Sequence, residues 1–352
     1  MNSKRRSILI ILIAGIGDLV LASKSIRSIR NGNQDKQIHL LTSSEAVTIA
    51  RNYEYIDHVW AFPLRKLRGN KSQIFNILEL ARKLRKIDFC SITNLYRVSS
   101  KAGAIRMGIL FLLLRAKIKI GHDQKGFHFF LNKRVPLETF RNRHFTDSMM
   151  DIAQLAGGVS DDKGIEIFWD KKSERKWKHL FSEKTKSTDK MTIGINPGAD
   201  KPHKRWNPDH YAHVADRLSE DINAKILILG GPGEEKISRY IQDKMKNRPI
   251  NLGGQLTLND LAYIISQLDL LVTNDSGPMH IAAAVKTPLV TIFGPEDPVY
   301  TKPYTPENLY RIVHKDVDCR PCSKRNCKRS ICLDLITPDE VIEKCFEMLP
   351  IN

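Results

Sequence analysis

Four residues able to bind a phosphorylated ligand, Asp275, Ser276, Gly277 and His280, lie within six positions of one another between two apolar runs. The pattern predicts a buried strand, a tight turn and a helix, with Ser276 as the helix N-cap and Pro278 in the first turn. The N–H groups at a helix N-terminus attract anions, and a glycine there lets a ligand approach the backbone. We therefore expect a phosphate-binding turn, with Asp275 holding hydroxyls and His280 reaching a phosphate. An ordinary strand-to-helix connection is the alternative interpretation.

A carboxylate follows the first apolar run of the chain, in the sequence Gly15-Ile16-Gly17-Asp18. The two glycines allow a tight turn and close approach of a substrate, and Asp18 begins the next predicted helix. If a sugar hydroxyl lies within hydrogen-bond reach, Asp18 can act as its general base. We predict that Gly17 and Asp18 contact an acceptor substrate. The alternative is an aspartate that only caps its helix.

A basic loop is predicted after the apolar run 192–196. It begins with Pro197-Gly198-Ala199 and contains Lys201, Lys204 and Arg205. Such a loop is often only solvated. Beside two phosphate-type turns, however, it predicts a clamp for a leaving diphosphate, with cations and helix dipoles neutralising the charge in place of a metal ion. We assign Gly198 and Lys204 to this clamp.

A second glycine-rich turn, Gly230–Gly233, precedes Glu234 and Glu235. An acidic residue after such a turn accepts hydrogen bonds from a ribose in many nucleotide sites. Acidic residues also compensate the dipole in the first turn of a helix. We predict Glu234 as a donor-binding residue, and leave compensation of the dipole as the alternative.

Four of the six cysteines lie within fourteen residues: Cys319, Cys322, Cys327 and Cys332. Four thiolates at this spacing are compatible with a tetrahedral structural zinc or iron site. Free thiols or a disulfide are the favoured interpretation, and we assign no metal ion to the catalytic site. A structural metal at this cluster is the alternative.

Both halves of the chain alternate predicted strands with predicted helices, the pattern of parallel sheets covered by helices. The charged, lysine-rich stretch 161–190 marks the junction. We predict two doubly wound α/β domains facing each other, with the ligand site in the cleft beyond the carboxyl ends of their strands. The boundaries are 1–170 for the first domain, 171–190 for a linker, 191–337 for the second domain and 338–352 for a C-terminal helix.

Lysine and arginine number 56 against 39 acidic residues, a formal net charge of +17. This surplus favours a polyanionic partner such as an anionic membrane surface or a phosphorylated glycolipid. We exclude nucleic acid as a partner because neither a basic DNA-reading helix nor an aromatic RNA-binding signature accompanies the charge. The basic start and apolar run to Ala14 imitate a signal peptide, but the run is short and lacks a cleavage site, which favours a buried first strand. We expect a cytoplasmic protein with reduced thiols that touches a membrane surface.

Taken together, these motifs resemble glycosyltransferase family 9, the bacterial heptosyltransferases. The resemblance runs from about residue 8 to residue 349. It is carried by the motifs above and by three further stretches: Lys204-Arg205-Trp206, Phe293-Gly294-Pro295, and Cys319-Arg320-Pro321-Cys322 with Ile336-Thr337-Pro338. Their order along the whole chain makes the match more specific than any one of them.

The resemblance implies a GT-B fold and an inverting, metal-independent enzyme. The C-terminal half would bind ADP-L-glycero-D-manno-heptose, and the N-terminal half the lipid-anchored, phosphorylated inner core of lipopolysaccharide at the inner face of the inner membrane. By position, Asp18 matches the family's proposed base and Lys204 its phosphate-contacting lysine. Asp275, Ser276, Gly277 and His280 match its donor-binding loop.

The chain departs from the family in the first half. The run Phe89–Asn94 lacks an acidic residue that many members carry there, and the segment Met107–Leu114 is unusually apolar with basic flanks. Both departures concern the acceptor. Two alternatives follow: a related transferase that uses another nucleotide sugar or a protein acceptor such as an autotransporter, and a non-enzymatic basic protein that docks on a polyanion.

Overall fold

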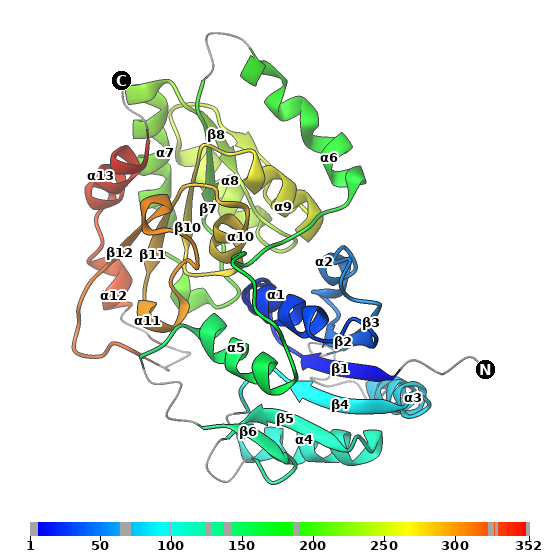
Figure 1. Cartoon of the computed structure of the whole chain (residues 1–352). Helices are drawn as coiled ribbons and strands as arrows, with labels where there is room; N and C mark the ends of the chain where they lie inside the picture. Colours follow the sequence, from blue (N-terminus) through cyan, green and yellow to red (C-terminus); the bar gives the residue numbers. More distant parts are fainter. Residues whose placement is uncertain are drawn as a thin grey trace. The chain divides into compact units, whose positions relative to one another are not determined.

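The computed structural model describes residues 6–63, 72–98, 100–123, 128–136, 142–185, 190–322, 327 and 330–349, with the side chains of 72–78 and 182–185 excepted. The chain divides into two compact units, residues 1–164 and 165–352. Each unit is built around one parallel sheet of six strands (Figure 1).

The first sheet has the strand order β3-β2-β1-β4-β5-β6. This is the order of a dinucleotide-binding fold, and the direction in which strands are added reverses between β1 and β4. Buried β-branched residues and leucine fill the central strands, as expected for a parallel sheet covered on both faces. The strands are β1 (Ser7–Leu12), β2 (Gln37–Ser43), β3 (His58–Phe62), β4 (Phe89–Asn94), β5 (Ile118–His122) and β6 (Lys133–Val135).

Helices cover both faces of this sheet. One face carries α1 (Ile16–Asn31) and α5 (Phe145–Leu155), which pack on each other, and the other carries α3 (Ser72–Arg85) and α4 (Lys101–Leu114) (Figure 1). A short helix, α2 (Val47–Ala50), follows β2. In the part of the chain that the structure describes, no helix is both long and apolar enough to span a bilayer.

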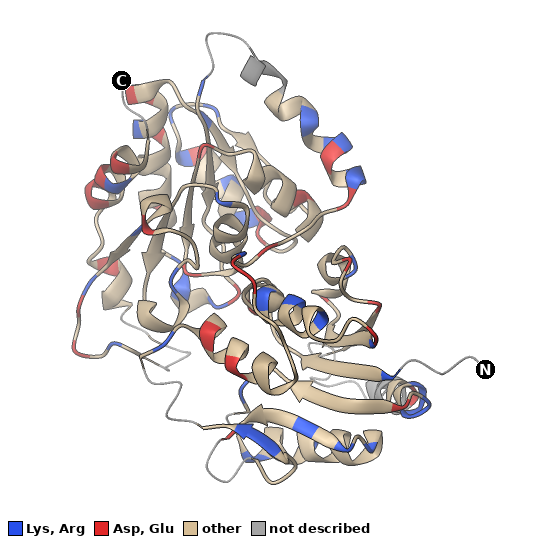
Figure 2. Ribbon diagram, viewed as in Figure 1, with Lys and Arg blue, Asp and Glu red and all other residues tan. Residues whose placement is uncertain are grey.

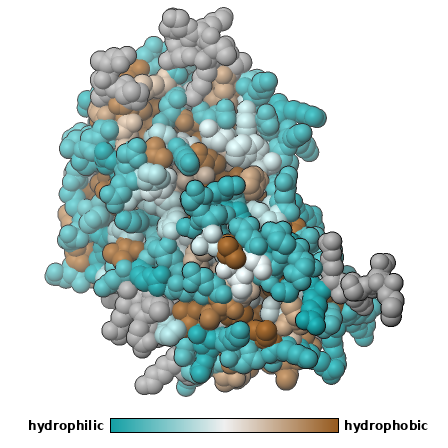
Figure 3. Space-filling view, viewed as in Figure 1, coloured by the Kyte–Doolittle hydropathy of each residue, from teal (hydrophilic) through white to brown (hydrophobic). Residues whose placement is uncertain are grey.

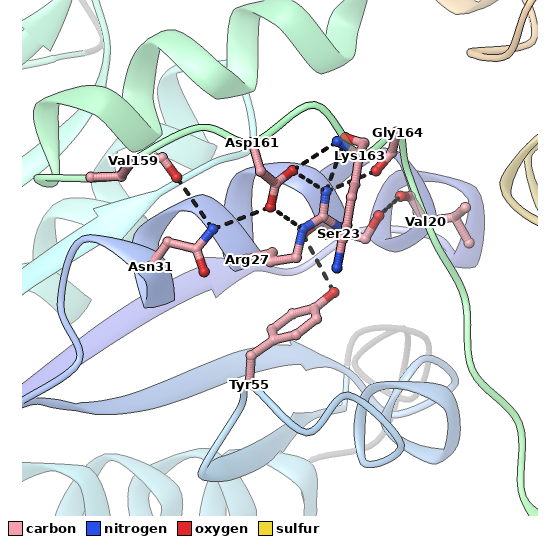
Figure 4. Close-up of polar contacts among 9 residues, drawn as sticks. All are labelled: Val20, Ser23, Arg27, Asn31, Tyr55, Val159, Asp161, Lys163 and Gly164. Carbon is pink, nitrogen blue, oxygen red and sulfur yellow. Dashed lines mark hydrogen bonds and ion pairs between the residues drawn. The ribbon is translucent and has the colours of Figure 1, made fainter.

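An arginine on α1 holds the end of the first unit in place (Figure 4). The guanidinium of Arg27 donates two 2.8 Å hydrogen bonds to the carboxylate of Asp161, and donates further ones to the carbonyl oxygens of Lys163 and Gly164. Arg27 is buried, and its hydrogen bonds lower the pKa of Asp161 to about 2. Asn31 donates to the same carboxylate. Bidentate, part-buried pairs of this kind are stronger than exposed ones, so this contact fixes where the first unit ends.

The second sheet repeats the same topology, with the order β12-β11-β10-β7-β8-β9. The direction of strand addition reverses between β7 and β10, where Thr273 pairs with Asn196 at the ends of the two strands. The strands are β7 (Thr192–Asn196), β8 (Lys225–Ile228), β9 (Ile250–Asn251), β10 (Leu270–Asn274), β11 (Leu289–Phe293) and β12 (Tyr310–His314).

One face of the second sheet packs against α7, α8 and α13, and the other carries α9 and α10. The main core joins strand residues to these first three helices, with Trp206 and Tyr211 fully buried in it. The helices are α6 (Lys171–Trp177), α7 (Pro208–Ile222), α8 (Glu235–Lys244), α9 (Leu258–Ser266), α10 (Gly277–Val285), α11 (Pro298–Thr301), α12 (Ile331–Asp334) and α13 (Pro338–Met348).

The unit boundary lies six residues before the predicted one. Most of the predicted linker, 171–190, belongs to the second unit, because α6 and a 3₁₀ segment (Lys178–Thr185) occupy it and α6 packs on α9. Lys176 of α6 makes an ion pair with Asp260 of α9 at 3.5 Å. Residues 186–189 of the predicted linker lie outside the described residues.

Candidate active site

The predicted donor-binding residues lie at the carboxyl ends of neighbouring strands in the second sheet. The loop that begins at Pro197 follows β7, the glycine-rich turn follows β8, and the turn at Asp275 follows β10. Parallel strands end at the same edge of a sheet, so these three loops share one edge at the point where the strand order reverses. Ligands of doubly wound domains bind at this position.

An ion-pair network joins the loop after β7, the turn after β10 and the loop after β11. Nζ of Lys204 lies 2.8 Å from Oδ2 of Asp275 and 3.2 Å from Oε1 of Glu296, which follows β11. Asp275 is almost fully buried and Lys204 mostly buried, whereas Glu296 is partly exposed. Lys201, in the same basic loop, also faces Glu296, at 3.7 Å. Two carboxylates thus hold the predicted phosphate-binding lysine at the sheet edge.

The electrostatics keep Lys204 charged. Burial alone would lower the pKa of its ammonium, but Asp275 and Glu296 outweigh burial and the net effect raises it. Burial raises the pKa of Asp275, and Lys204 acts in the opposite direction. A fixed ammonium at the edge of the sheet is a group that can stabilise an anion.

Asn274, the last residue of β10, fixes the loop after β7. Its side-chain amide donates to the carbonyl oxygens of Pro197 and Gly198 at 2.8 and 3.2 Å, and its Oδ1 accepts from the N–H of Trp206 at 2.9 Å. Asn274 is completely buried. Sequence reasoning assigned no role to Asn274 or Glu296. The signal for Asn274 is a polar residue at the end of a buried strand, whereas Glu296 lies three residues after the end of β11.

The turn at Ser276 has the predicted backbone but not the expected capping bond. Ser276 is the N-cap of α10 and Pro278 lies in its first turn, yet the Ser276 side chain makes no capping hydrogen bond. Its hydroxyl instead donates to the carbonyl oxygen of Asn274 at 3.3 Å. The first-turn N–H groups therefore gain no partner from this side chain. His280 lies in the same helix and is buried.

Glu234 and Gly198 hold two loops against each other. The carboxylate of Glu234 accepts a hydrogen bond from the N–H of Gly231 at 2.9 Å, within a turn that Gly233 completes at φ +93°. A Cβ on Gly198 would lie 1.8 Å from Oε1 of Glu234, so any larger residue there would displace the Glu234 carboxylate. Burial raises the pKa of Glu234. These contacts give Glu234 a loop-fixing role, and its contact with a ribose stays a prediction.

The predicted base, Asp18, lies in the first unit after β1, where the strand order of that sheet reverses. It occupies the third position of α1, and its Oδ2 accepts a hydrogen bond from the N–H of the N-cap residue Gly15 at 2.9 Å. Gly17 lies in the same first turn. Asp18 thus caps its helix, as the alternative interpretation holds, while its side chain remains partly exposed.

The four clustered cysteines come together in the second unit. They line one small cavity with His203 and Arg320. Burial, and then the neighbouring thiol of Cys319, raise the pKa of Cys332, which favours a thiol over a thiolate. Among the residues that the structure describes, no group of three or more His, Cys, Asp or Glu side chains is arranged to hold a metal ion.

Comparison with known proteins places these features in context. Residues 78–332 match the model of glycosyltransferase family 9 (heptosyltransferase). Lipooligosaccharide heptosyltransferase 2 of Campylobacter jejuni is 37% identical over 167 residues, which cover 46% of this chain and 51% of that protein. The chain thus spans about half the length of this curated relative.

Two solved structures align over nearly the whole chain. The family 9 glycosyl transferase of Veillonella parvula has a TM-score of 0.80 at 22% identity, covering 99% of this chain and 98% of that one. Escherichia coli heptosyltransferase WaaC, solved with ADP-2-deoxy-2-fluoro heptose, has a TM-score of 0.71 at 14% identity, covering 97% and 99%. These likenesses confirm the predicted fold class, an α/β GT-B architecture with two Rossmann-like domains.

Proposed function

Because the chain belongs to glycosyltransferase family 9 (heptosyltransferase), we propose that it transfers heptose from ADP-L-glycero-D-manno-heptose to the inner core of lipopolysaccharide. The observation that carries the proposal is the position of Lys204, held by Asp275 and Glu296 at the strand ends of the second sheet. The relative from Campylobacter jejuni is a lipooligosaccharide heptosyltransferase, and WaaC was solved with an ADP-heptose analogue. Both support this choice of donor and acceptor.

In the proposed reaction the second unit stabilises the leaving group. The bond between the anomeric carbon and the diphosphate oxygen breaks, and its electrons pass to ADP. Lys204, the first-turn N–H groups of α10 and His280 receive the developing negative charge. The site then needs no metal ion for this step, because a fixed cation and a helix dipole already lie at the strand ends.

In the same step the acceptor hydroxyl attacks the anomeric carbon from the opposite face, which inverts the configuration. Asp18 takes the proton that the hydroxyl loses. A carboxylate that does so must be accessible to the acceptor, and Asp18 is partly exposed. We propose that Gly17 lets the acceptor approach, that the acceptor is lipid-anchored, and that the reaction takes place at the cytoplasmic face of the inner membrane.

A direct transfer assay tests the proposal. The full chain is incubated with ADP-heptose and a truncated core acceptor, and the product is analysed by mass spectrometry and by the anomeric coupling in its NMR spectrum. We expect one added heptose of inverted configuration, with no transfer from GDP- or UDP-sugars and undiminished activity in EDTA. Transfer from another nucleotide sugar, or to a protein acceptor alone, would refute the substrate assignment.

We propose that the cysteine cluster holds reduced thiols and serves the fold, not the transfer. The raised pKa of Cys332, which favours a thiol over a thiolate, supports this. Elemental analysis of protein purified without chelator should find less than about one metal ion per ten chains. About one zinc or iron per chain would show that the cluster is a structural metal site.

A further inference from the structure

The helix α4 of the first unit exposes an apolar face that the sheet does not need. Ala104, Gly108, Phe111 and Leu114 form the stripe that packs on the core. The opposite side of the helix carries large apolar residues as well: Ile105, Ile109, Leu112 and Leu113 are all exposed, Leu112 by 72%. Helices of soluble proteins usually turn a polar face to water.

Phe129 extends this exposed face beyond the helix. A Cβ on Gly108 would lie 2.9 Å from the ring of Phe129, so the ring rests directly on α4. Phe129 is 66% exposed, and its ring meets that of the buried Phe130 edge-on, at 5.3 Å between centroids. The α4 surface is defined as Ile105, Ile109, Leu112, Leu113 and Phe129. Hydrophobic residues are visible in the lower part of Figure 3, where Figure 1 shows β4 to β6 and α4.

Basic residues lie at both ends of α4 and on the strands that follow it. Figure 2 shows lysine and arginine on β5 and β6 with few acidic residues beside them. The exposed basic residues on α4 and on the segments that follow it are Lys101, Arg106, Arg115, Lys117, Lys133 and Arg134. An apolar patch with a cationic rim matches the surface of an anionic bilayer, where acyl chains lie beneath negative headgroups.

A cavity at the C-terminal end of α4 adds a site for a headgroup. It has a volume of about 240 Å³, and its lining residues include Arg85, Lys86 and Arg115, with Asp88 as the single acidic one. Leu114, the last residue of the helix, lines the same cavity. Cationic groups that converge beside an apolar helix can bind a lipid phosphate while the helix contacts the acyl chains.

We propose that the α4 surface is a docking site for an anionic lipid bilayer, with Arg85, Lys86 and Arg115 receiving a lipid phosphate. A second copy of this chain is a poorer occupant, because a symmetric dimer through this face would bring the two cationic rims together. With 14 residues, α4 is suited to lie in the interface and too short to span a bilayer. The proposal deepens the proposed function, since a lipid-anchored acceptor would lie at such a surface.

The test is flotation of the full chain with vesicles, without donor or acceptor, so that its outcome does not depend on catalysis. We expect binding to vesicles of phosphatidylglycerol and phosphatidylcholine but not to pure phosphatidylcholine. The double variant I109E/L112E should bind the anionic vesicles at least tenfold more weakly. Its matched control is L155E/V159E, two exposed apolar residues at the end of α5 on the other face of the sheet, which should bind within twofold of the natural chain.

A second arm tests the cationic cavity. R85Q/R115Q should weaken binding to anionic vesicles by roughly tenfold or more, since each cation near such a surface contributes about a fivefold factor. Thermal unfolding of every variant checks that the fold is retained.

Three results would overturn the proposal: no binding of the natural chain to anionic vesicles, unchanged binding of I109E/L112E, or a change in oligomeric state of that variant in place of a change in vesicle binding. Failure of the heptose-transfer assay, by contrast, would refute the proposed function and leave the flotation result standing.

Discussion

The two sheets share one strand order, but the loops at the point where that order reverses hold their charged side chains in different ways. In the second unit, Lys204, Asp275 and Glu296 come from three loops and are joined across them, and Asn274 ties two of these loops together. In the first unit, the carboxylate of Asp18 bonds to the N–H of Gly15 in its own turn.

The two units therefore position their predicted functional residues in different ways. The second unit holds a cation in a fixed position before any ligand arrives, which lowers the reorganisation required when a diphosphate leaves. The first unit presents a carboxylate on one helix turn. We therefore expect substitutions in the second unit to affect both binding and stability, and the substitution of Asp18 to affect catalysis far more than stability.

The largest expected effect is on turnover in D18N. Loss of the proposed base should reduce kcat by at least about a thousandfold, within the range for general-base catalysis. The affinity for ADP should change by less than twofold, because the donor contacts lie in the other unit. Steady-state kinetics and calorimetric titration with ADP measure the two quantities.

The matched control for this variant is D260N. Asp260 occupies the same third position of α9 and caps Thr257 N–H at 3.0 Å, as Asp18 caps Gly15 N–H at 2.9 Å. Asp260 is buried and also makes an ion pair with Lys176, so D260N should lose more stability than D18N while losing little turnover. A kcat of D18N within tenfold of the natural chain would contradict the assignment as base.

The next effect is on the stability of the second unit in D275N. Removing the buried partner leaves Lys204 with only the partly exposed Glu296 at 3.2 Å, so the loss should be at or below the value of about 3 to 5 kcal/mol that is typical of a broken buried pair. E296Q removes the partly exposed partner instead and should cost less than about 1 kcal/mol. Urea unfolding of both variants measures the difference, and equal losses would mean that burial does not distinguish the two carboxylates.

A further effect, expected to be largest in the first unit, follows acidification. Burial lowers the pKa of His122 on β5 to about 3 and that of His39 on β2 to about 4. Both pKa values lie below the ordinary value of 6.5, so the unfolded chain binds protons that the folded chain does not. The stability these residues contribute is complete above about pH 6.5 and is lost as the pH falls toward the folded-state values.

Each of these histidines should then lower the free energy of unfolding by up to about 1.4 kcal/mol for each pH unit below about 6.5. Hydrogen exchange at pH values of about 7, 5.5 and 4.5 should show the strands of the first sheet weakening before those of the second. In H122Q the loss should be about half as steep, because one of the two histidines is removed. An unchanged slope in this variant would rule out His122 as a source of the acid sensitivity.

The sequence was sufficient to predict the central strands of both sheets. Short segments rich in Ile, Leu or Val mark β1, β7 and β10, and turns with glycine or proline follow them. The strands that sequence reasoning missed, β3, β6 and β12, all lie at sheet edges. An edge strand is buried on fewer sides, so short segments with charged residues such as Lys133–Val135 do not produce an apolar signal.

In the candidate site, too, some residues could be predicted from the sequence and others could not. Lys204, Asp275 and Gly198 were predicted from their own motifs, and the structure brings them to one edge of the sheet. Glu296 was missed because the sequence does not say which strand neighbours β10, and only the observed order puts β11 there. The role of Asn274 was missed for a similar reason. Its side chain bonds to Pro197, which is distant in the sequence, and the sequence does not show such a contact.

The most direct test of the central claim, that the second unit holds a preformed diphosphate site around Lys204, is a calorimetric comparison of ADP with AMP. The natural chain should bind ADP at least tenfold more tightly than AMP, because the β-phosphate meets the ammonium of Lys204, and K204A should bind the two nucleotides with similar affinities. Equal affinities in the natural chain, or an ADP preference that survives in K204A, would contradict the account.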